Sequence, residues 1–381
     1  MKTSSLTHRQ RFRIAVDRKE PDRVPFELGG STSMMNDPLY FKVKDLLGVN
    51  REIQPYRAGK ASNYYDEEVW ERLGSDFRHV WLGSPDNFQV QVDEQGKYID
   101  EWGIARKTKG NGAGEIFAPL GDADLDGLNN YRWPDPYDKG RIRGLKERAR
   151  WLHEHTDYVV SAKYPVTDPL LGLGMELRGS KFFIDLLANK RFANALLDKI
   201  TQVIYGLYES IMEEAGSFLD MVEIADDFAR QSAPLISGHL YREMFMPRYR
   251  EIVNMIKKKA PGVKVFFHSC GAIYTLIPWF IETGYDIINP LQPNCRGTDH
   301  QKIKHEFGSE VCFHGAIDVQ AAMLGSEEDV KREVRRRIDA LAPGGGYILS
   351  TANQLQQDTP PENVICLSRY AREYGCYRQS M

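Results

Sequence analysis

The sequence predicts a (β/α)8 TIM barrel with a hairpin and loop insertion after its second strand, and three observations support this fold class. The chain has 381 residues, 42% of them hydrophobic, so it can bury a large core, and it exceeds the usual size of a single domain unless that domain is a barrel. Eight short runs of β-branched or aromatic residues alternate with longer stretches whose apolar residues recur at helical spacing. Most of these runs are apolar on both faces, as buried parallel strands are.

The expected strands follow one another along the chain at residues 24–28, 77–82, 158–162, 221–225, 263–268, 286–290, 311–315 and 346–350. A closed barrel of this type requires eight strands. Because strands alternate with helical patterns, we expect a parallel sheet with the helices on its outside.

The clearest expected helices lie between these strands and after the last one, at residues 190–214, 240–259, 273–283, 329–341 and 361–374. In the fourth helix, Val330, Val334 and Ile338 form one apolar stripe, and basic residues cover the other faces. We interpret that basic run as a solvated surface. Pro361 is suited to the first turn of the last helix.

Two segments depart from the alternation, and both follow the second expected strand. Residues 88–107 alternate in polarity around the turn sequence 94–97, which predicts a hairpin. Residues 118–138 are rich in Gly, Asp and Pro, which is typical of a loop. Since no repeat or long linker interrupts the sequence, we expect residues 1–381 to form a single domain.

Composition restricts the classes of partner. The 50 basic and 53 acidic residues give a formal charge of −3, so we expect no nucleic-acid partner. No apolar run approaches the roughly 20 residues that a membrane span needs, and the first residues lack the apolar core of a signal peptide. Five scattered cysteines are read as reduced thiols. These features predict a cytoplasmic protein that does not associate with membranes.

In a (β/α)8 barrel the reactive side chains lie at the carboxyl ends of the strands, so polar residues that follow the expected strands are site candidates. We expect a convergent cavity there. The expected substrate-binding side chains are Tyr164, Gln292, Asp318 and Asn353.

His268 and Cys270 lie two residues apart at the end of the fifth expected strand, and imidazole with thiolate is a ligand pair that favours zinc. Cys295 is the expected third ligand, with Glu223 or His314 as alternatives, since catalytic zinc commonly has three protein ligands. The other interpretation is structural: His268 forms hydrogen bonds at the rim, and Cys270 is a small buried residue before a glycine turn.

Acidic and histidine side chains supply candidates for proton transfer. Glu223, Asp226 and Asp227 gather at the end of one strand, where burial and mutual repulsion can raise a pKa enough for general acid catalysis. Of these, Glu223 or Asp226 is expected to face the cavity, and the alternative is an Asp that caps the following helix. His314, near Asp318, is a candidate proton shuttle or hydrogen-bond donor, or a structural rim histidine.

Several motifs, taken together and in order, resemble the uroporphyrinogen decarboxylase superfamily. They are DRVPFELGG, LGSDFR, LRGSKFFIDLL, IADDFARQ, HSCGAIYTLIPWFIETGYDIINPLQPNC, FGSEVCFHGAIDVQ and GGGYILSTANQLQQDTPPENV. The resemblance implies a (β/α)8 barrel with a deep site at the strand ends. Decarboxylases of this superfamily carry an arginine-rich R-Q-A-G-R-Y signature after strand one, and here residues 28–33 read LGGSTS. Because a tetrapyrrole with several carboxylates needs fixed cations, this departure disfavours decarboxylation of uroporphyrinogen.

The superfamily's other branch contains corrinoid-dependent methyltransferases, some of which bind zinc through H-x-C and a distant cysteine near the last strand. His268 and Cys270 match the first part, but the distant position reads Ala352-Asn353-Gln354. Either Cys295 substitutes for the missing thiol or the zinc site is incomplete. The resemblance also implies that a homodimer is possible.

We therefore expect a methyltransferase that moves a methyl group between a small donor, such as a methyl ether or methylamine, or a thiol acceptor, and a cobalamin. Since the chain lacks a D-x-H-x-x-G segment, a separate corrinoid protein is expected to carry that cofactor. Zinc would activate the thiol or the leaving oxygen, and Glu223 or Asp226 would protonate the leaving group. The alternatives are a carbon–carbon lyase that acts on a carboxylated substrate and a non-catalytic barrel that binds a tetrapyrrole or corrinoid.

Overall fold

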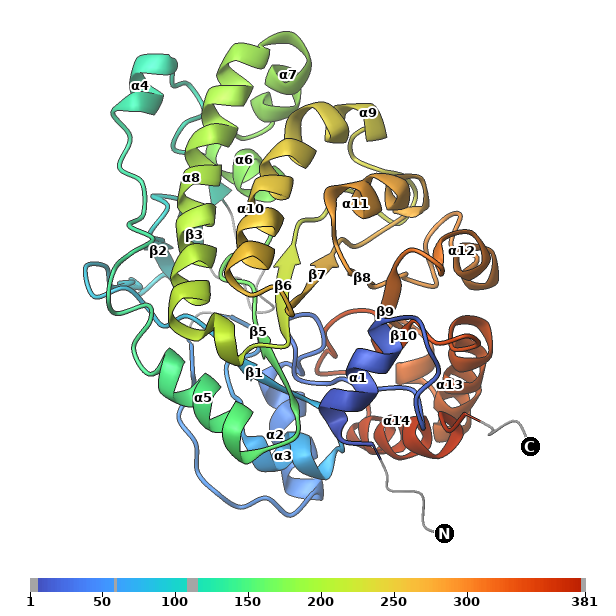
Figure 1. The fold of residues 1–381 in the computed structure, drawn as a ribbon. Helices are drawn as coiled ribbons and strands as arrows, with labels where there is room; N and C mark the ends of the chain where they lie inside the picture. Colours follow the sequence, from blue (N-terminus) through green and yellow to red (C-terminus); the bar gives the residue numbers. More distant parts are fainter. Residues whose placement is uncertain (1–5, 58–59, 108–115, 378–381) are drawn as a thin grey trace.

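Seven parallel strands form one curled sheet in the order β1-β5-β6-β7-β8-β9-β10 (Figure 1). The computed structural model describes residues 6–57, 60–107 and 116–377. The strands are β1 (Phe77–Val80), β5 (Val159–Ala162), β6 (Met221–Ala225), β7 (Lys264–His268), β8 (Ile287–Asn289), β9 (Cys312–Ile317) and β10 (Tyr347–Thr351). All seven overlap the strands expected from the sequence. Their apolar runs are buried on both faces, so the pattern and the packing agree.

The first expected strand, residues 24–28, is not an assigned strand. Phe26 instead makes an isolated parallel bridge to Leu349 in β10. On its other side, the carbonyl of Phe26 accepts the N–H of Asp76, directly before β1, at 2.8 Å. Pro25 has no N–H to donate, which limits the ladder at this point. The segment therefore lies between the two outermost strands of the curled sheet but pairs with them only briefly.

Helices surround the outside of the curled sheet (Figure 1). Those that precede or flank the first strands are α1 (His8–Val16), α2 (Asp37–Leu46), α3 (Glu67–Arg72), α4 (Leu125–Asn129) and α5 (Leu145–His155). The later ones are α6 (Leu171–Arg178), α7 (Lys181–Ala188), α8 (Lys190–Ala215), α9 (Gly238–Leu240), α10 (Met246–Lys259), α11 (Ile277–Thr283), α12 (His300–Phe307), α13 (Glu327–Leu341) and α14 (Pro361–Tyr374). No helix among the described residues is both long enough and apolar enough to cross a bilayer.

The helix expected over residues 240–259 is interrupted. A π-helical turn, Tyr241–Phe245, separates the short α9 from α10. Pro247 lies in the first turn of α10, and proline cannot donate the hydrogen bond that a continuous α-helix needs at that position. Apolar periodicity therefore predicted the helical stretch but not its break.

A small antiparallel sheet lies in the chain between β1 and β5. It contains β2 (Lys97–Ile99), β3 (Ala105–Lys107) and β4 (Ile116–Phe117). β2 and β3 form a hairpin whose connecting turn follows β2, which differs from the hairpin expected around residues 94–97. Asp100 forms that turn by accepting the N–H groups of Trp102 and Ile104, each at 3.0 Å. The side chain of Arg106 bonds both carboxylate oxygens of Glu176 in α6, which joins the small sheet to the helix that follows β5.

An apolar cluster fills the amino end of the curled sheet. Two of its members, Phe12 and Val16, come from α1, and the others come from the first residues of the strands, among them Phe77, Met221 and Cys312. Helix α1 therefore closes this end. Cys312 is a core residue, in agreement with its position inside an apolar strand.

Candidate functional site

Three potential metal ligands meet at the carboxyl end of the curled sheet. The Sγ of Cys270 lies 3.2 Å from Nε2 of His268, and that nitrogen lies 3.6 Å from Oδ1 of Asp227. The three ligand atoms are all within 4.8 Å of one another. We call Asp227, His268 and Cys270 the ligand cluster. One imidazole, one thiol and one carboxyl group form a donor set of the kind that binds zinc.

Backbone pairing brings the ligand cluster together. In the register of β6 and β7, Ala225 lies opposite His268, so Asp227 follows β6 where Cys270 follows β7. The backbone N–H of Cys270 donates to Oδ1 of Asp227 at 2.7 Å. Gly271 has φ +96°, and a Cβ there would lie 2.6 Å from the backbone of Ala229. Glycine is therefore required for the chain to turn directly after Cys270.

The ring of His268 is held from its other side. Its Nδ1 lies 2.5 Å from Oδ1 of Asn289, a residue at the end of β8. An amide oxygen can only accept, so Nδ1 is the donor in this contact, and Nε2 is the nitrogen that faces Cys270 and Asp227. A hydrogen bond to the ring nitrogen that does not bind metal is the usual support of a metal-binding histidine.

The thiol of Cys270 lies among amide donors and acidic groups. The side-chain nitrogens of Asn353 and Gln292 donate to its Sγ at 3.3 Å and 3.6 Å. Burial raises the pKa of the Cys270 thiol well above its usual value, and the charges of Asp227 and Asp168 add to this effect. A cation bound at the cluster would reverse that preference and favour the thiolate.

Cys295, the expected third ligand, does not belong to the ligand cluster. Its Sγ donates to Oε1 of Gln292 at 3.3 Å. That same oxygen accepts the N–H of Gly271 at 2.8 Å, and the amide nitrogen of Gln292 faces Cys270. The Gln292 side chain therefore contacts both sulfurs and bridges them. Asp227, which the sequence marked only as a member of an acidic group, takes the third position.

Glu223 is fully buried in β6, two residues before Ala225. Its carboxylate accepts the N–H of Ser31 at 3.1 Å and the hydroxyl of Ser161 at 3.2 Å, and it lies 3.6 Å from Nε2 of His79. Burial raises the pKa of Glu223, and the nearby charge of Glu27 raises it further. This carboxyl group can therefore hold a proton near neutral pH.

Asp226 has a different role from the one expected. Its carboxylate accepts the backbone N–H groups of Leu170, Leu171 and Gly172 at 3.2, 2.7 and 3.3 Å, so it caps the start of α6. The hydroxyl of Tyr249 in α10 also donates to it, at 2.6 Å. These partners belong to the outer helices. Asp226 therefore caps a helix, but that helix is α6, which precedes it in the chain, and not the following helix of the alternative interpretation.

His314 faces a buried acid that the sequence did not indicate. Its Nε2 lies 3.4 Å from Glu27, and Nε2 of His79 lies 3.3 Å from the same carboxylate. Glu27 also accepts the N–H of Gly30 at 2.6 Å and the hydroxyl of Ser33 at 2.7 Å. Burial alone would raise the pKa of Glu27, but the close approach of the His314 and His79 rings outweighs burial and holds the pKa well below its usual value.

Lys163 is a second functional candidate that the sequence did not indicate. It follows β5, and its buried ammonium lies 5.0 Å from the ring centres of Tyr56 and Tyr65 and 5.7 Å from that of Trp81. Its Nζ also lies 3.2 Å from the sulfur of Met34. Burial lowers the pKa of Lys163. The aromatic faces stabilise a cation that has lost its water shell.

Two more missed residues border the ligand cluster, Asn289 and Asp168. Asp168 has a left-handed backbone with φ +50° and accepts the N–H of Asp227 at 3.0 Å. Burial raises the pKa of Asp168, and the charge of Asp227 raises it further.

A sequence signal for Glu27, His79 and Lys163 did exist, because each is a charged or titratable residue within or directly after an expected apolar strand.

The expected substrate-binding residues occupy different positions. Gln292 and Asn353 contact the ligand cluster, and Tyr164 is half-buried directly after Lys163. Asp318 accepts the amide of Asn294 at 2.9 Å and the N–H of Gln320 at 2.8 Å. Asp318 therefore organises the loop after β9.

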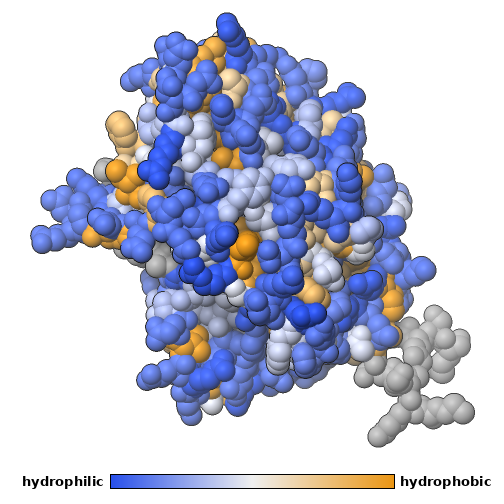
Figure 2. Space-filling view, turned by 60° about the vertical axis from the view of Figure 1, so that its left-hand side comes forward, coloured by the Kyte–Doolittle hydropathy of each residue, from blue (hydrophilic) through white to orange (hydrophobic). Residues whose placement is uncertain are grey.

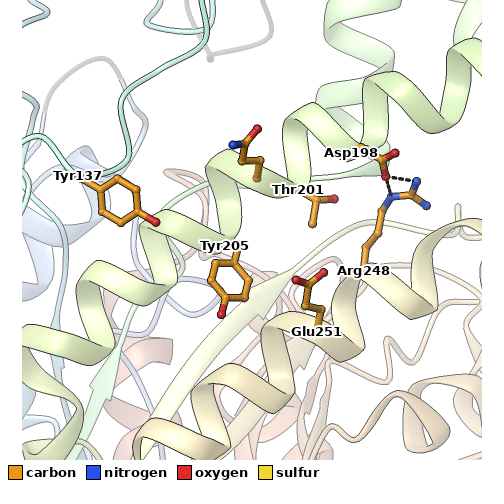
Figure 3. Close-up of a pocket in the computed structure, with 7 residues that line it drawn as sticks. Tyr137, Asp198, Thr201, Tyr205, Arg248 and Glu251 are labelled. Carbon is orange, nitrogen blue, oxygen red and sulfur yellow. Dashed lines mark hydrogen bonds and ion pairs between the residues drawn. The ribbon is translucent and has the colours of Figure 1, made fainter.

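A separate cleft of about 320 Å³ lies on the outer surface between α8 and α10 (Figure 3). Its lining includes Tyr137, Tyr205 and Glu251, with an ion pair between Arg248 and Asp198 at one end. None of these side chains lies at the strand ends, so we assign this cleft no part in the chemistry. The face in Figure 2 is mainly hydrophilic, with scattered apolar patches.

Comparison with known proteins relates the chain to one family. The model of the uroporphyrinogen decarboxylase (URO-D) family matches residues 125–374, about two thirds of the chain. A uroporphyrinogen decarboxylase from Chlorobium luteolum is 29% identical over 188 residues, 48% of this chain and 49% of that protein. The chain thus spans about half the length of the first curated relatives it matches. A uroporphyrinogen decarboxylase from Hamiltonella defensa is 27% identical over 274 residues, 68% of this chain and 69% of that protein.

Among solved structures, a methyltransferase from Methanosarcina mazei superposes with a TM-score of 0.64. The superposition covers 97% of this chain and 99% of that one, at 17% sequence identity. At this identity the likeness concerns the fold alone.

Proposed function

This chain belongs to the uroporphyrinogen decarboxylase family, and from that premise and the ligand cluster we propose that it is a corrinoid-dependent methyltransferase. In this proposal the enzyme moves a methyl group between a small donor, such as a methyl ether or methylamine, or a thiol acceptor, and a cobalamin. A partner corrinoid protein carries the cobalamin to the strand ends. The observation that carries the proposal is the convergence of Asp227, His268 and Cys270 within 4.8 Å.

We also propose that the curled sheet is a complete (β/α)8 barrel and that residues 1–381 are a single domain. The support is the position of Phe26, whose backbone contacts both β10 and the residue before β1. In such a barrel the carboxyl ends of the strands share one mouth, which is where the ligand cluster lies.

The donor set fits zinc. A neutral imidazole, a thiolate and a carboxylate give three ligands and leave a position for substrate. Asn289 already holds Nδ1 of His268, so the ring needs no rotation to offer Nε2. A zinc ion there would supply Lewis acidity, either to keep a thiol acceptor as thiolate or to draw charge from the oxygen of a methyl ether. The amides of Gln292 and Asn353 would orient the sulfur of Cys270.

Glu223 is the proposed proton donor to the leaving group. Burial keeps its carboxyl group protonated near neutrality, and the hydrogen bonds from Ser31 and Ser161 fix its position. Lys163, held by its aromatic neighbours, supplies positive charge to the same region. A properly placed general acid accelerates such a step by roughly 10²–10⁴-fold.

The loop at residues 28–33 argues against a substrate with several carboxylates. Its N–H groups hold the protein's own acids: Gly30 donates to Glu27 at 2.6 Å, and Ser31 donates to Glu223 at 3.1 Å. With the carboxylates of Glu27 and Asp227 near the strand ends, a polyanionic substrate would meet like charge. A small, neutral or cationic methyl donor avoids that repulsion.

The test begins with the metal and then follows the cobalt spectrum. We expect the purified protein to contain stoichiometric zinc, which the Asp227→Asn variant loses and the Cys295→Ser variant keeps. Mixed with cob(I)alamin and a panel of methyl ethers, methylamines and methylated thiols, the zinc-loaded enzyme should form methylcobalamin with at least one donor. A protein that binds no zinc and forms no methylcobalamin with any donor would refute the proposal.

A second candidate is a carbon–carbon lyase that acts on a smaller carboxylated substrate. The curated relatives favour this lyase, since those that the chain matches in the comparison above carry the name uroporphyrinogen decarboxylase. In that reaction the buried ammonium of Lys163 would hold one carboxylate. Release of carbon dioxide by the zinc-free protein, lost in a Lys163→Met variant, would support the lyase over the methyltransferase.

A further inference from the structure

We propose that Glu27 determines, through His314 and Asn289, which ring nitrogen of His268 carries the proton, and so keeps Nε2 of His268 free to bind a cation. The use of a free Nε2 for binding a metal rests on the proposed function. The position of the proton on His268 does not, because the proton occupies that position in the protein without metal. Glu27, His314 and Asn289 are thus positioning residues for His268.

The first step is the orientation of the Asn289 amide. Its Nδ2 lies 2.8 Å from Nδ1 of His314 and 3.3 Å from the carbonyl oxygen of His314. A carbonyl oxygen only accepts hydrogen bonds, so the NH₂ end of the amide must face His314. The amide oxygen is then turned to His268, whose Nδ1 lies 2.5 Å away and must donate.

The second step is the tautomer of His314. Because Asn289 donates to its Nδ1, a neutral His314 carries its proton on Nε2. That nitrogen lies 3.4 Å from the Glu27 carboxylate and has no well-aligned partner among the described residues. Both side chains are almost fully buried, where the field of a carboxylate is little screened. The charge of Glu27 therefore favours the proton on the nitrogen that faces it.

The third step is the fixed position of Glu27. The Gly30 N–H and the hydroxyls of Ser33 and Ser350 donate to its carboxylate at 2.6, 2.7 and 2.9 Å. These donors stabilise the anion and prevent it from turning away. Since Ser350 lies in β10 and Ser33 follows residues 24–28, the anion is held where the two outermost parts of the curled sheet meet.

If the donors and acceptors in this chain of hydrogen bonds were reversed, Nε2 of His268 could no longer bind a metal. A His314 with its proton on Nδ1 would face the NH₂ group of Asn289, donor against donor. The amide would then have to rotate and point its oxygen at the His314 carbonyl. Nδ1 of His268 would become an acceptor, and its proton would move to Nε2, next to Cys270 and Asp227. A protonated Nε2 cannot coordinate a metal.

The experiment reads the tautomers directly in metal-free protein. Long-range ¹H–¹⁵N correlation spectra of histidine-labelled protein distinguish the Nδ1–H, Nε2–H and doubly protonated forms. We expect Nδ1–H for His268 and Nε2–H for His314. His300 is an internal reference, because its Nε2 faces the carbonyl of Leu291 at 2.8 Å and its Nδ1 accepts from Arg337 at 2.8 Å.

In Glu27→Gln the anion is removed at nearly constant volume. We expect His314 and His268 to become mixtures of tautomers while His300 is unchanged, and zinc affinity to fall roughly 10–100-fold, the usual effect of losing such support. Ser33→Ala is the matched control, since it removes one donor but keeps the charge. It should leave all three tautomers as in the wild type.

Asn289→Asp provides an independent test if the first variant fails to fold. A carboxylate keeps an acceptor for His268, which should stay Nδ1–H, but it offers His314 an acceptor in place of a donor. His314 should therefore gain a proton on Nδ1. A wild-type His268 in the Nε2–H form, an unaltered His268 in folded Glu27→Gln, or an unaltered His314 in Asn289→Asp would each overturn the inference. Absence of zinc from the wild type would instead count against the proposed function alone.

Discussion

The two ends of the curled sheet both collect buried acids but surround them differently. At the amino end, Asp76 is paired with His8 at 2.5 Å, Arg23 at 2.7 Å and Arg11 at 3.0 Å. At the carboxyl end, the described contacts of the Glu223 carboxyl group are with the backbone N–H of Ser31, the hydroxyl of Ser161 and the imidazole of His79. A buried carboxyl group is therefore neutralised by cations at one end, whereas the one at the other end has no guanidinium partner among the described residues.

The pKa values follow this difference. Burial would raise the pKa of Asp76, but His8 and Arg23 outweigh it and hold the pKa well below its usual value. Burial raises the pKa values of Glu223 and Asp168, and neighbouring acids add to the effect. The amino end thus uses its acids for stability, whereas the carboxyl end keeps acids that can exchange protons.

The largest expected effect comes from the carboxyl end and concerns the ligand cluster. Cys270→Ala should reduce bound zinc from stoichiometric to background and abolish methyl transfer, because one of three ligands is lost. Elemental analysis measures the bound zinc, and the cobalt spectrum measures methyl transfer. Cys366→Ala, in α14, is the matched control and should keep zinc and activity. Equal zinc in the two variants would contradict the assignment of the cluster.

Next in size is the effect of Glu223→Gln. Loss of a general acid should lower kcat roughly 10²–10⁴-fold for donors with poor leaving groups, with little change in zinc content. Donors with good leaving groups need no protonation and should react almost normally. A uniform loss across all donors would show that Glu223 acts on structure instead.

At the amino end, Asp76→Asn should destabilise the fold by about 3–5 kcal/mol, because it leaves a buried cationic cluster without its anion. Urea unfolding of the metal-free protein measures the change. The folded fraction should bind zinc as tightly as the wild type. A loss of zinc affinity at constant stability would contradict the separation of the two ends.

The pH dependence of stability should have opposite signs at the two ends. Asp76, with a lowered pKa, contributes stability above its unfolded pKa of about 3.9 and loses it as pH falls. Glu223, with a raised pKa, binds its proton more tightly when folded, so its stabilisation is lost as pH rises from about 4.3 towards neutrality. Unfolding free energies measured across this range should decline less steeply in Glu223→Gln than in the wild type.

The smallest expected effect also lies at the amino end. Asp220 binds Arg9 at 2.9 Å and Arg13 at 3.0 Å, but Arg13 is largely exposed. Arg13→Ala should therefore cost less than about 1 kcal/mol, because solvent and salt screen an exposed pair. Arg9→Ala, which removes the more buried partner, should cost more, and an equal cost in urea unfolding would contradict this ranking.

Much of the fold could be predicted from local pattern. The strand expected at residues 221–225 has those bounds in the structure. Its five residues are all buried and polar residues flank them, so the sequence pattern marks both ends of the strand. Helix α6 was missed, since Gly172 and Gly174 give it a low helical propensity, and the cap from Asp226 lies far along the chain. A local sequence pattern does not predict a hydrogen bond from a residue so far along the chain.

The part of the candidate site that is local in sequence could be predicted. His268 and Cys270 lie two residues apart and therefore form a recognisable motif. Glu27 acquires its role only from neighbours such as His314 and Ser350, which are distant in the chain. The sequence indicated Asp227 only as a member of an acidic group, and only the folded chain reveals that it lies with His268 and Cys270 and that Gln292 bridges the two thiols.

The closure of the amino end by Phe12 and Val16 of α1 has a kinetic consequence. A sheet that is sealed at one end admits reactants from the other end alone. On the proposed function, the small methyl substrate and the corrinoid protein must then share one entrance. The small molecule would have to arrive before the large partner covers it, and an excess of free partner should inhibit turnover. Steady-state kinetics should accordingly be ordered, with the small substrate binding first.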